Sequence, residues 1–258
     1  MTEHTTRRSL WVLLFTVFGM GVTISMGIWQ LDRAAQKQHL HDTLMARQSM
    51  PSLGNLTLPC QAEAWLQQEQ RQARLTGRWL HERTVVLDNR PMQGRPGLLV
   101  LTPLLLSPAP AGCPQAALLV QRGWVPRDPY ERTRIAEFAK PQGDVVVTAR
   151  LTFAPSKMLS LQRESAPEHG LLRQNVDLGA LAKEWQVPLL PGSAQQLVNE
   201  QTVEGPVQDE SMLRAWWQPV VEVGKHRAYA AQWFLMALVM LGLYGWFQWW
   251  RPYRAVKE

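Results

Sequence analysis

Residues 10–29 read LWVLLFTVFGMGVTISMGIW, and no charged residue occurs from position 9 to position 31. A second uncharged stretch, residues 228–250, reads AYAAQWFLMALVMLGLYGWFQWW. Each uncharged stretch has 23 residues. As an α-helix, such a stretch would be roughly 34 Å long, and the hydrocarbon core of a bilayer is about 30 Å thick. We therefore predict transmembrane helices over residues 9–31 and 228–250.

Each stretch has an alternative interpretation that the sequence disfavours. A cleaved signal peptide has an apolar region of about 7–15 residues that ends at a small-x-small site. The first stretch is longer, and residues 25–27 (SMG) match such a site poorly. A buried core helix is the alternative for the second stretch, but its apolar residues occur on all sides of the helix. Its three terminal tryptophans, Trp246, Trp249 and Trp250, are typical of a membrane interface.

The charges at the two ends of the chain predict its orientation. Residues 1–8 and 251–258 contain five of the Lys and Arg residues, and they account for +3 of the net charge of +6. Short loops rich in Lys and Arg remain cytoplasmic, whereas long translocated domains follow this rule weakly. We therefore expect a multi-pass inner-membrane protein with both tails in the cytoplasm and residues 32–227 in the periplasm. Membrane lipid is the expected non-protein partner. Nucleic acid is not expected, because no basic stripe with interleaved aromatic residues occurs.

The segment between the two stretches predicts a domain made mainly of β-strands. Short runs rich in Val, Leu, Thr and Trp, many bounded by Pro, Gly or Asn, predict strands. They cover residues 71–80, 84–89, 97–104, 117–125, 144–153, 196–202 and 217–223. Helices are expected over residues 30–48, 60–70, 129–140 and 177–186. The predicted fold class is an α+β membrane protein: two terminal transmembrane helices flank a mainly antiparallel sheet or open barrel with a few helices.

Motifs for catalysis and metal binding are missing from the sequence. It contains no GxSxG, HExxH, Walker or CxxCH motif. We therefore expect neither an enzyme nor a covalent c-type haem. Cys60 and Cys113 are 53 residues apart without a CxxC pattern. Both a disulfide and two free thiols are compatible with this spacing.

One histidine occupies a position that suits a haem ligand. His226 precedes the second uncharged stretch by two residues. This position places its imidazole at the periplasmic surface of the membrane. Trp233 lies seven residues further on, on the same helical face, and Trp29 and Gln30 lie near the end of the first stretch at the same depth. A neutral imidazole in apolar surroundings can act as an axial ligand of haem iron. The alternative is an ordinary interfacial histidine, and Trp29 fits an aromatic belt equally well.

Small residues indicate where the two helices pack against each other. Gly21 and Ser25 in the first stretch, and Ala237 and Gly242 in the second, would allow close approach of the two backbones.

Four segments together resemble a known family. They are residues 27–33 (GIWQLDR) with Lys37, residues 88–104 (DNRPMQGRPGLLVLTPL), residues 120–126 (VQRGWVP) and residues 226–234 (HRAYAAQWF). In this order, and with two anchors, they resemble the surfeit locus protein family of cytochrome c oxidase assembly factors. The resemblance spans both anchors and the domain between them.

The resemblance implies a function for the whole chain. It implies an assembly factor for haem-copper oxidases that assists haem a insertion into, or maturation of, subunit I. The implied partners are subunit I and the proteins of haem a synthesis and assembly. The implied cofactor is transiently bound haem a, with His226 as its axial ligand and Trp29, Tyr229 and Trp233 nearby. The alternative is a cofactor-free chaperone that stabilises an oxidase assembly intermediate.

The remaining motif residues also have structural interpretations. Members of the family commonly have Asn before this histidine, whereas here Lys225 and Arg227 flank it. These cations could pair with haem propionates or act as interfacial anchors. Residues 122–126 are expected to end a strand with a packed tryptophan and a close backbone approach at Gly123. Residues 89–94 are expected to form a turn between strands.

Overall fold

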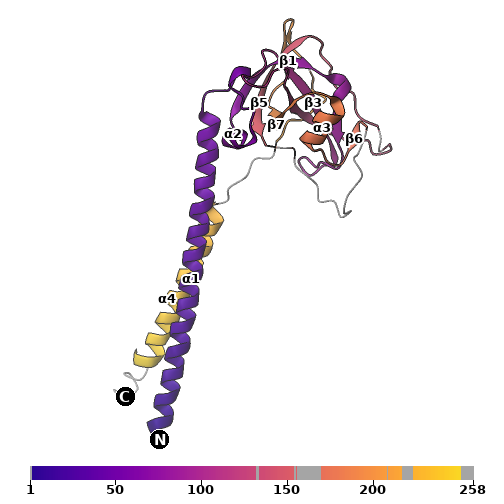
Figure 1. Cartoon of the computed structure of the whole chain (residues 1–258). Coiled ribbons are helices and arrows are strands. Elements are labelled where there is room, and N and C mark those ends of the chain that lie inside the picture. Colours follow the sequence, from indigo (N-terminus) through magenta and orange to yellow (C-terminus); the bar gives the residue numbers. More distant parts are fainter. Residues whose placement is uncertain are drawn as a thin grey trace. The chain divides into compact units, whose positions relative to one another are not determined.

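The protein forms two compact units in the computed structural model (Figure 1). The described residues are 2–131, 134–153, 155, 170–207, 209–216 and 223–250. The helical unit combines Met1–Thr43 with Pro219–Glu258, and the β-rich unit is Leu44–Gln218.

Two long helices build the helical unit. Helix α1 covers Thr2–Ser49 and helix α4 covers Val223–Gly245, followed by the π-helical turn η3 at Trp246–Trp250. Helix α1 continues through residues 30–48, as the sequence predicts. Both helices contain segments long and apolar enough to cross a membrane, Leu10–Ser49 and Gly224–Gln248.

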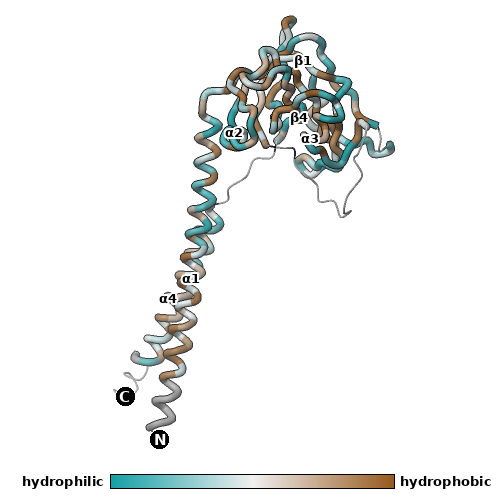
Figure 2. The backbone as a smooth tube through the Cα atoms, viewed as in Figure 1, coloured by the Kyte–Doolittle hydropathy of each residue, from teal (hydrophilic) through white to brown (hydrophobic). Residues whose placement is uncertain are grey.

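The apolar side chains of these helices face outward. Only 11% of the most apolar window of each helix is buried, unlike a core helix of a soluble protein. Phe15 and Phe18 are each 71% exposed and Leu238 is 64% exposed. In Figure 2 the hydrophobic colour follows α4 and much of α1. Such surface is stable in contact with lipid and unfavourable in water.

Helices α1 and α4 run antiparallel along a seam of small side chains. The small-residue seam comprises Gly19, Thr23, Gly27 and Ala34 of α1 and Ala230 and Ala237 of α4. A Cβ atom at Gly27 would lie 2.6 Å from the ring of Phe234, and one at Gly19 would lie 3.2 Å from Met240 Sδ. The absence of side chains at these two glycines therefore leaves room for Phe234 and Met240 of α4, which runs antiparallel to α1 in Figure 1.

The predicted seam residues are correct only in part. Ala237 is buried, as expected. Gly21, Ser25 and Gly242 are exposed, so their prediction is wrong. Positions 21 and 25 lie about 200° around the helix from positions 19 and 23, because each residue turns an α-helix by about 100°.

Five strands of the β-rich unit close into a barrel. These strands are β1 (Gln72–Trp79), β3 (Gly97–Leu106), β4 (Ala117–Pro126), β5 (Asp144–Thr152) and β7 (Leu189–Gln196). Strand β3 pairs with β1 and β4, β7 pairs with β4 and β5, and β5 pairs with β1, which completes the circuit. All these pairs are antiparallel except β4–β7. The result is a closed barrel, where the sequence predicts a mainly antiparallel sheet or an open barrel.

Apolar side chains from all five strands fill one core. Leu75, Leu104, Leu118, Leu151 and Ala194, one from each strand, are each 0% exposed and belong to this cluster. Helix α2 (Ala62–Gln67) contributes Trp65, which is fully buried and donates from Nε1 to the carbonyl of Thr152 at 2.8 Å.

Shorter elements extend and cover the barrel. They are β2 (Val85–Leu87), β6 (Leu172–Arg173), β8 (Gln201–Thr202), β9 (Gly205–Pro206), α3 (Leu178–Trp185) and the 3₁₀ turns η1 (Asn55–Thr57) and η2 (His81–Arg83). Asp177 caps the N-terminus of helix α3, where its side chain accepts a hydrogen bond from the Ala180 amide. Leu181 and Trp185 of α3 pack against a second cluster formed by β2, β3 and β4.

The structure confirms most of the predicted strands and helices. Strands β1 to β5 fall at the five predicted runs between residues 71 and 153, and α2 and α3 fall within predicted helices. The sequence does not predict strand β7, and of residues 196–202 only Gln196 and β8 are in strands. Of the predicted strand over residues 217–223, positions 217–222 lie outside the described residues.

The helix predicted over residues 129–140 is wrong. The described residues of this segment, 129–131 and 134–140, are not helical. The Asp128 side chain accepts bonds from the amides of Tyr130 and Glu131, which forms a turn. Ile135 and Phe138 pack on a third apolar cluster. Tertiary contacts therefore hold the segment in an irregular conformation.

Cys60 and Cys113 form a disulfide, with their Cα atoms 6.1 Å apart. Of the two possibilities that the sequence allows, the structure contains the bond.

Candidate functional site

The structure pairs His226 with a residue of the other long helix. His226 lies in the first turn of α4 and is half-buried. Its Nδ1 lies 2.7 Å from Oε1 of Gln30, which is also half-buried and projects from α1. The second ring nitrogen, Nε2, makes no hydrogen bond with the part of the chain that the structure describes. The pair therefore leaves one nitrogen of the imidazole for a ligand.

The three aromatic residues predicted for this site differ in exposure, and none is joined to His226 in the described structure. Trp29 is 56% exposed and Tyr229 is 54% exposed. Trp233 is half-buried and lies two helical turns after His226, on the same face of α4. Among the described residues, no hydrogen bond or ring contact joins any of the three to His226. The residue that the structure brings to His226 is Gln30.

Gln30 was not predicted as a site residue. Its signal in the sequence is its place at the end of the first uncharged stretch, at the same depth as His226. To identify the contact, one must also know which side of α1 faces α4. The small-residue seam determines that side.

Two of the family-like segments meet in the β-rich unit. The turn between β2 and β3 has positive φ angles at Asn89, Gln93 and Gly94, which confirms the predicted turn. Its Arg90 carbonyl accepts a hydrogen bond from Trp124 Nε1 at 2.6 Å. Asp88, at the start of the turn, forms an ion pair with Arg127. These contacts fasten the turn to the end of β4.

Residues 122–126 have the structural role that the sequence indicates. Trp124 is 1% exposed. A Cβ atom at Gly123 would lie 2.6 Å from Met212 Cβ, so the chain at Met212 approaches the strand closely. Both expectations for this segment are therefore confirmed.

Arg122 is the centre of a buried polar network. The side chains of Arg122 and Glu200 are both 0% exposed, and their closest N–O distance is 2.6 Å. The guanidinium also lies 4.8 Å from the ring centre of Trp79. Gln196 donates to the second oxygen of Glu200 at 2.5 Å, and Arg214 Nε donates to the Arg122 carbonyl at 2.8 Å. Ion pairing and hydrogen bonding offset the cost of burying these charges.

Burial also changes the proton affinity of groups around this network. It lowers the pKa of Arg122, and the nearby Glu200 carboxylate partly counters this effect. Burial likewise lowers the pKa of His81, although a hydrogen bond with the Pro141 carbonyl acts in the opposite direction. Burial alone would raise the pKa of Asp209, but hydrogen bonds from Ser211 and Ala139 lower it below its usual range.

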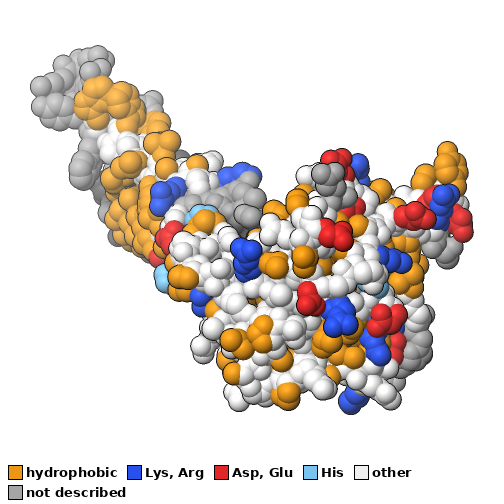
Figure 3. Space-filling view, turned by 90° about the horizontal axis from the view of Figure 1, so that it is seen from above, with side chains coloured by type: hydrophobic (Ala, Val, Ile, Leu, Met, Phe, Trp, Pro, Cys, Tyr) orange, Lys and Arg blue, Asp and Glu red, His pale blue; other side chains and the backbone are white. Residues whose placement is uncertain are grey.

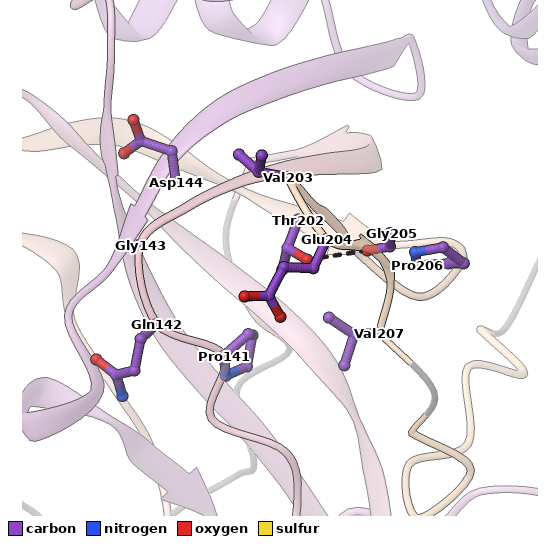
Figure 4. A pocket seen from close by; sticks show the side chains of 10 residues that line it. All are labelled: Pro141, Gln142, Gly143, Asp144, Thr202, Val203, Glu204, Gly205, Pro206 and Val207. Atoms are coloured by element: carbon purple, nitrogen blue, oxygen red, sulfur yellow. Dashed lines mark hydrogen bonds between the residues drawn. The ribbon is translucent and has the colours of Figure 1, made fainter.

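An open groove of about 600 Å³ lies beside the β8–β9 hairpin (Figure 4). The segment from Pro141 to Asp144 lines one side, and the hairpin lines the other. Thr202 Oγ1 is engaged with the Gly205 carbonyl at 3.0 Å. In Figure 4 the carboxylates of Asp144 and Glu204 point in different directions. The labelled residues therefore form no paired-carboxylate site.

A second groove of about 560 Å³ contains several cations that already have partners. Arg173 binds Glu184 through two nitrogens at 2.9 and 2.5 Å. Arg83 donates to the Trp185 carbonyl. These guanidinium groups thus stabilise the fold around α3.

The surface of the β-rich unit carries charges of both signs. On the face drawn in Figure 3, Lys and Arg side chains are interspersed with Asp and Glu. Within the described ranges, no group of three or more His, Cys, Asp or Glu residues could hold a metal ion. His226 with Gln30 therefore remains the strongest candidate site.

Comparison with known proteins identifies the family. The model of the SURF1 family matches residues 17–238, which include most of α1 and α4 and the whole β-rich unit. No curated protein matches the chain. The family is associated with cytochrome c oxidase assembly and is not a known enzyme family. Because the match covers most of the chain, the protein belongs to the SURF1 family.

Proposed function

We propose that this protein is an inner-membrane assembly factor for a haem-copper cytochrome c oxidase. In this role it assists haem a insertion into subunit I or the maturation of that subunit. The family match over residues 17–238 carries the proposal, because the family is associated with assembly of this oxidase.

Three features support an inner-membrane location with a periplasmic domain. Helices α1 and α4 both contain long apolar segments whose side chains face outward. Lys and Arg are concentrated in residues 1–8 and 251–258, as expected for cytoplasmic tails. The Cys60–Cys113 disulfide suits an oxidising compartment such as the periplasm.

His226 is the residue that would hold the iron of haem a. Its Nε2 is unpaired within the described structure, and its half-buried position at the start of α4 would suit a ligand of the iron. Trp233, further along the same face, would contact the porphyrin. Lys225 and Arg227 are both exposed beside His226, where they would pair with the propionates. These side chains thus fit haem a, which would supply the iron that the His226 imidazole binds.

Absorption spectra of purified protein test this proposal. Wild type, His226→Ala and His39→Ala are produced in cells that make haem a. His39 is an exposed histidine of α1 and provides a matched control. We expect haem in the wild type and in His39→Ala, and loss of nearly all haem in His226→Ala, because that substitution removes the ligand itself. Equal haem in all three preparations would exclude ligation by His226.

The cofactor-free chaperone makes a different prediction for the same preparations. It would co-purify with oxidase subunit I, and none of the three variants would contain stoichiometric haem. Measuring haem and subunit I in the same sample therefore distinguishes the two functions.

A further inference from the structure

We propose that Gln30 is a positioning residue that selects Nε2 of His226 as the metal-binding atom. This inference rests on the proposed haem-binding function. It assigns a role to a residue that lies 196 positions away from His226 in the sequence and on the other long helix.

The hydrogen bond determines the position of the proton on the ring. Gln30 Oε1 lies 2.7 Å from Nδ1 of His226, and a carbonyl oxygen can only accept a hydrogen bond. Nδ1 must therefore carry the ring proton. In a neutral imidazole the other nitrogen then has a free lone pair, which is the form that binds a metal ion.

The bond also limits rotation of the ring. A histidine that binds a metal usually donates its second N–H to an acceptor, which fixes both tautomer and orientation and raises the basicity of the ligand. Gln30 supplies this acceptor. Histidine alone at this position would be free to turn either nitrogen toward a ligand.

The small-residue seam holds the two side chains within reach. Gln30 lies between Gly27 and Ala34 on α1, close to one helical turn from each, and His226 lies one turn before Ala230 on α4. Gly27 allows the Phe234 ring to approach the backbone of α1, and Ala34 and Ala230 are 3% and 1% exposed. The contact of Gly27 with Phe234 and the burial of Ala34 and Ala230 therefore favour the rotation of the two helices in which Gln30 reaches His226.

Two substitutions of Gln30 separate the role of its oxygen from that of its bulk. Gln30→Met keeps the length and apolar stem of the side chain but removes the acceptor. Gln30→Glu keeps an acceptor and makes it anionic. Gln36→Met is the matched control, because Gln36 lies on the exposed side of the same helix, where it accepts a bond from Arg33.

Haem a is titrated into each variant, purified as the full chain in detergent, and the ferrous iron–histidine vibration is recorded by resonance Raman spectroscopy. We expect Gln30→Met to weaken haem binding about 10- to 100-fold, the usual effect of losing such a partner. Gln30→Glu should bind about as tightly as wild type, with the vibration at higher frequency because an anionic acceptor makes the imidazole more basic. Gln36→Met should match wild type in both measurements.

Specific results would overturn the positioning role. Wild-type affinity and vibration in Gln30→Met would do so, as would binding by Gln30→Glu as weak as that of Gln30→Met. Cysteines placed at Gly19 and Met240 report helix pairing by cross-linking. If Gln30→Met lost both haem and the cross-link, the hydrogen bond would serve helix association instead. If His226→Ala binds haem like wild type, haem ligation by His226 fails, whatever Gln30 does, whereas loss of haem in His226→Ala with wild-type binding in Gln30→Met overturns the positioning role alone.

Discussion

Arg122 shows what a buried charge requires at the scale of one residue. Its guanidinium has no exposed surface and is held between the Glu200 carboxylate and the ring of Trp79. Removing one member of a buried ion pair leaves the other charge without compensation, which is far more costly than losing an exposed pair. The pair therefore makes the β-rich unit sensitive to conservative changes.

Glu200→Gln should destabilise the protein strongly. The substitution keeps the shape of the side chain but leaves Arg122 charged and buried, so we expect a loss of about 3–5 kcal/mol in unfolding free energy. Urea unfolding of the full chain in detergent, followed by tryptophan fluorescence, measures this loss. Glu82→Gln is the control, since the Glu82 side chain is 68% exposed and its pair with Arg83 should contribute at most about 1 kcal/mol. Equal unfolding curves for Glu200→Gln and wild type would contradict the argument.

His81 should make the stability of the β-rich unit depend on pH. Its Nε2 bonds to the Pro141 carbonyl at 2.8 Å, while Nδ1 is buried and has no partner in the described structure. Burial and the charges of Arg122 and Lys140 lower the pKa of His81 in the folded state, against the effects of Pro141 and Glu82. The unfolded state therefore binds more protons, and the contribution to stability falls as pH drops below about 6.5 toward the folded pKa.

Thermal unfolding at pH values from 8 to 5 tests this dependence. His81→Gln keeps a donor for Pro141 but cannot become charged, so its melting temperature should fall less than that of wild type between pH 7 and 5. His41→Gln, on helix α1, should retain the wild-type dependence. An unchanged slope in His81→Gln would show that other groups cause the dependence.

The candidate site could be predicted from the sequence only in part. His226 was identifiable because its position next to an uncharged stretch places it at an interface. Gln30 was not, because its contact depends on which sides of two helices face each other. That information is distributed over Gly19, Thr23 and Gly27, and the sequence also offers Gly21 and Ser25 as alternatives.

At the scale of the element, Gly27 and Gly21 are opposite cases in one helix. A Cβ atom at Gly27 would lie 2.6 Å from Phe234, whereas one at Gly21 would meet nothing within 4 Å. Gly27→Leu should therefore force α1 and α4 apart, at a cost of about 1–3 kcal/mol. Cross-linking between cysteines at positions 19 and 240 should fall in Gly27→Leu and remain high in Gly21→Leu. Equal cross-linking yields in the two variants would contradict the claim that Gly27, and not Gly21, faces α4.

Strand β7 shows why some elements escape prediction from sequence. It reads LLPGSAQQ, and its Pro and Gly are typical of a turn. Its pairing with β4 shifts register between Leu189 and Ser193, so Pro191 lies where the ladder is already interrupted. Gly192 lies directly against Trp65, where a side chain would not fit. Both residues break the pattern of a strand for reasons that exist only in the folded barrel.

At the scale of the whole molecule, the distribution of charge is the strongest signal of topology in the sequence. The tails account for half of the net charge although they contain few residues. This pattern, with two outward-facing apolar helices, predicts that the β-rich unit is translocated.

Fusions to reporter enzymes test this orientation. Alkaline phosphatase, which is active only after export, should be active when fused after Trp216, the last described residue before α4. Green fluorescent protein fused to Glu258 should fluoresce, because the C-terminal tail is expected in the cytoplasm. An inactive but well-expressed phosphatase fusion would contradict the orientation.

The closed barrel has a consequence for aggregation. Exposed edge strands offer unpaired backbone groups to other chains, and a protein exported in an unfolded state meets many such chains. Here the five long strands pair on both sides, and the pairing of described strands ends at β6 and β9, each of two residues. One residue of β9 is Pro206, which has no amide hydrogen to donate. The described strands of the β-rich unit therefore present little backbone that could recruit a neighbouring strand.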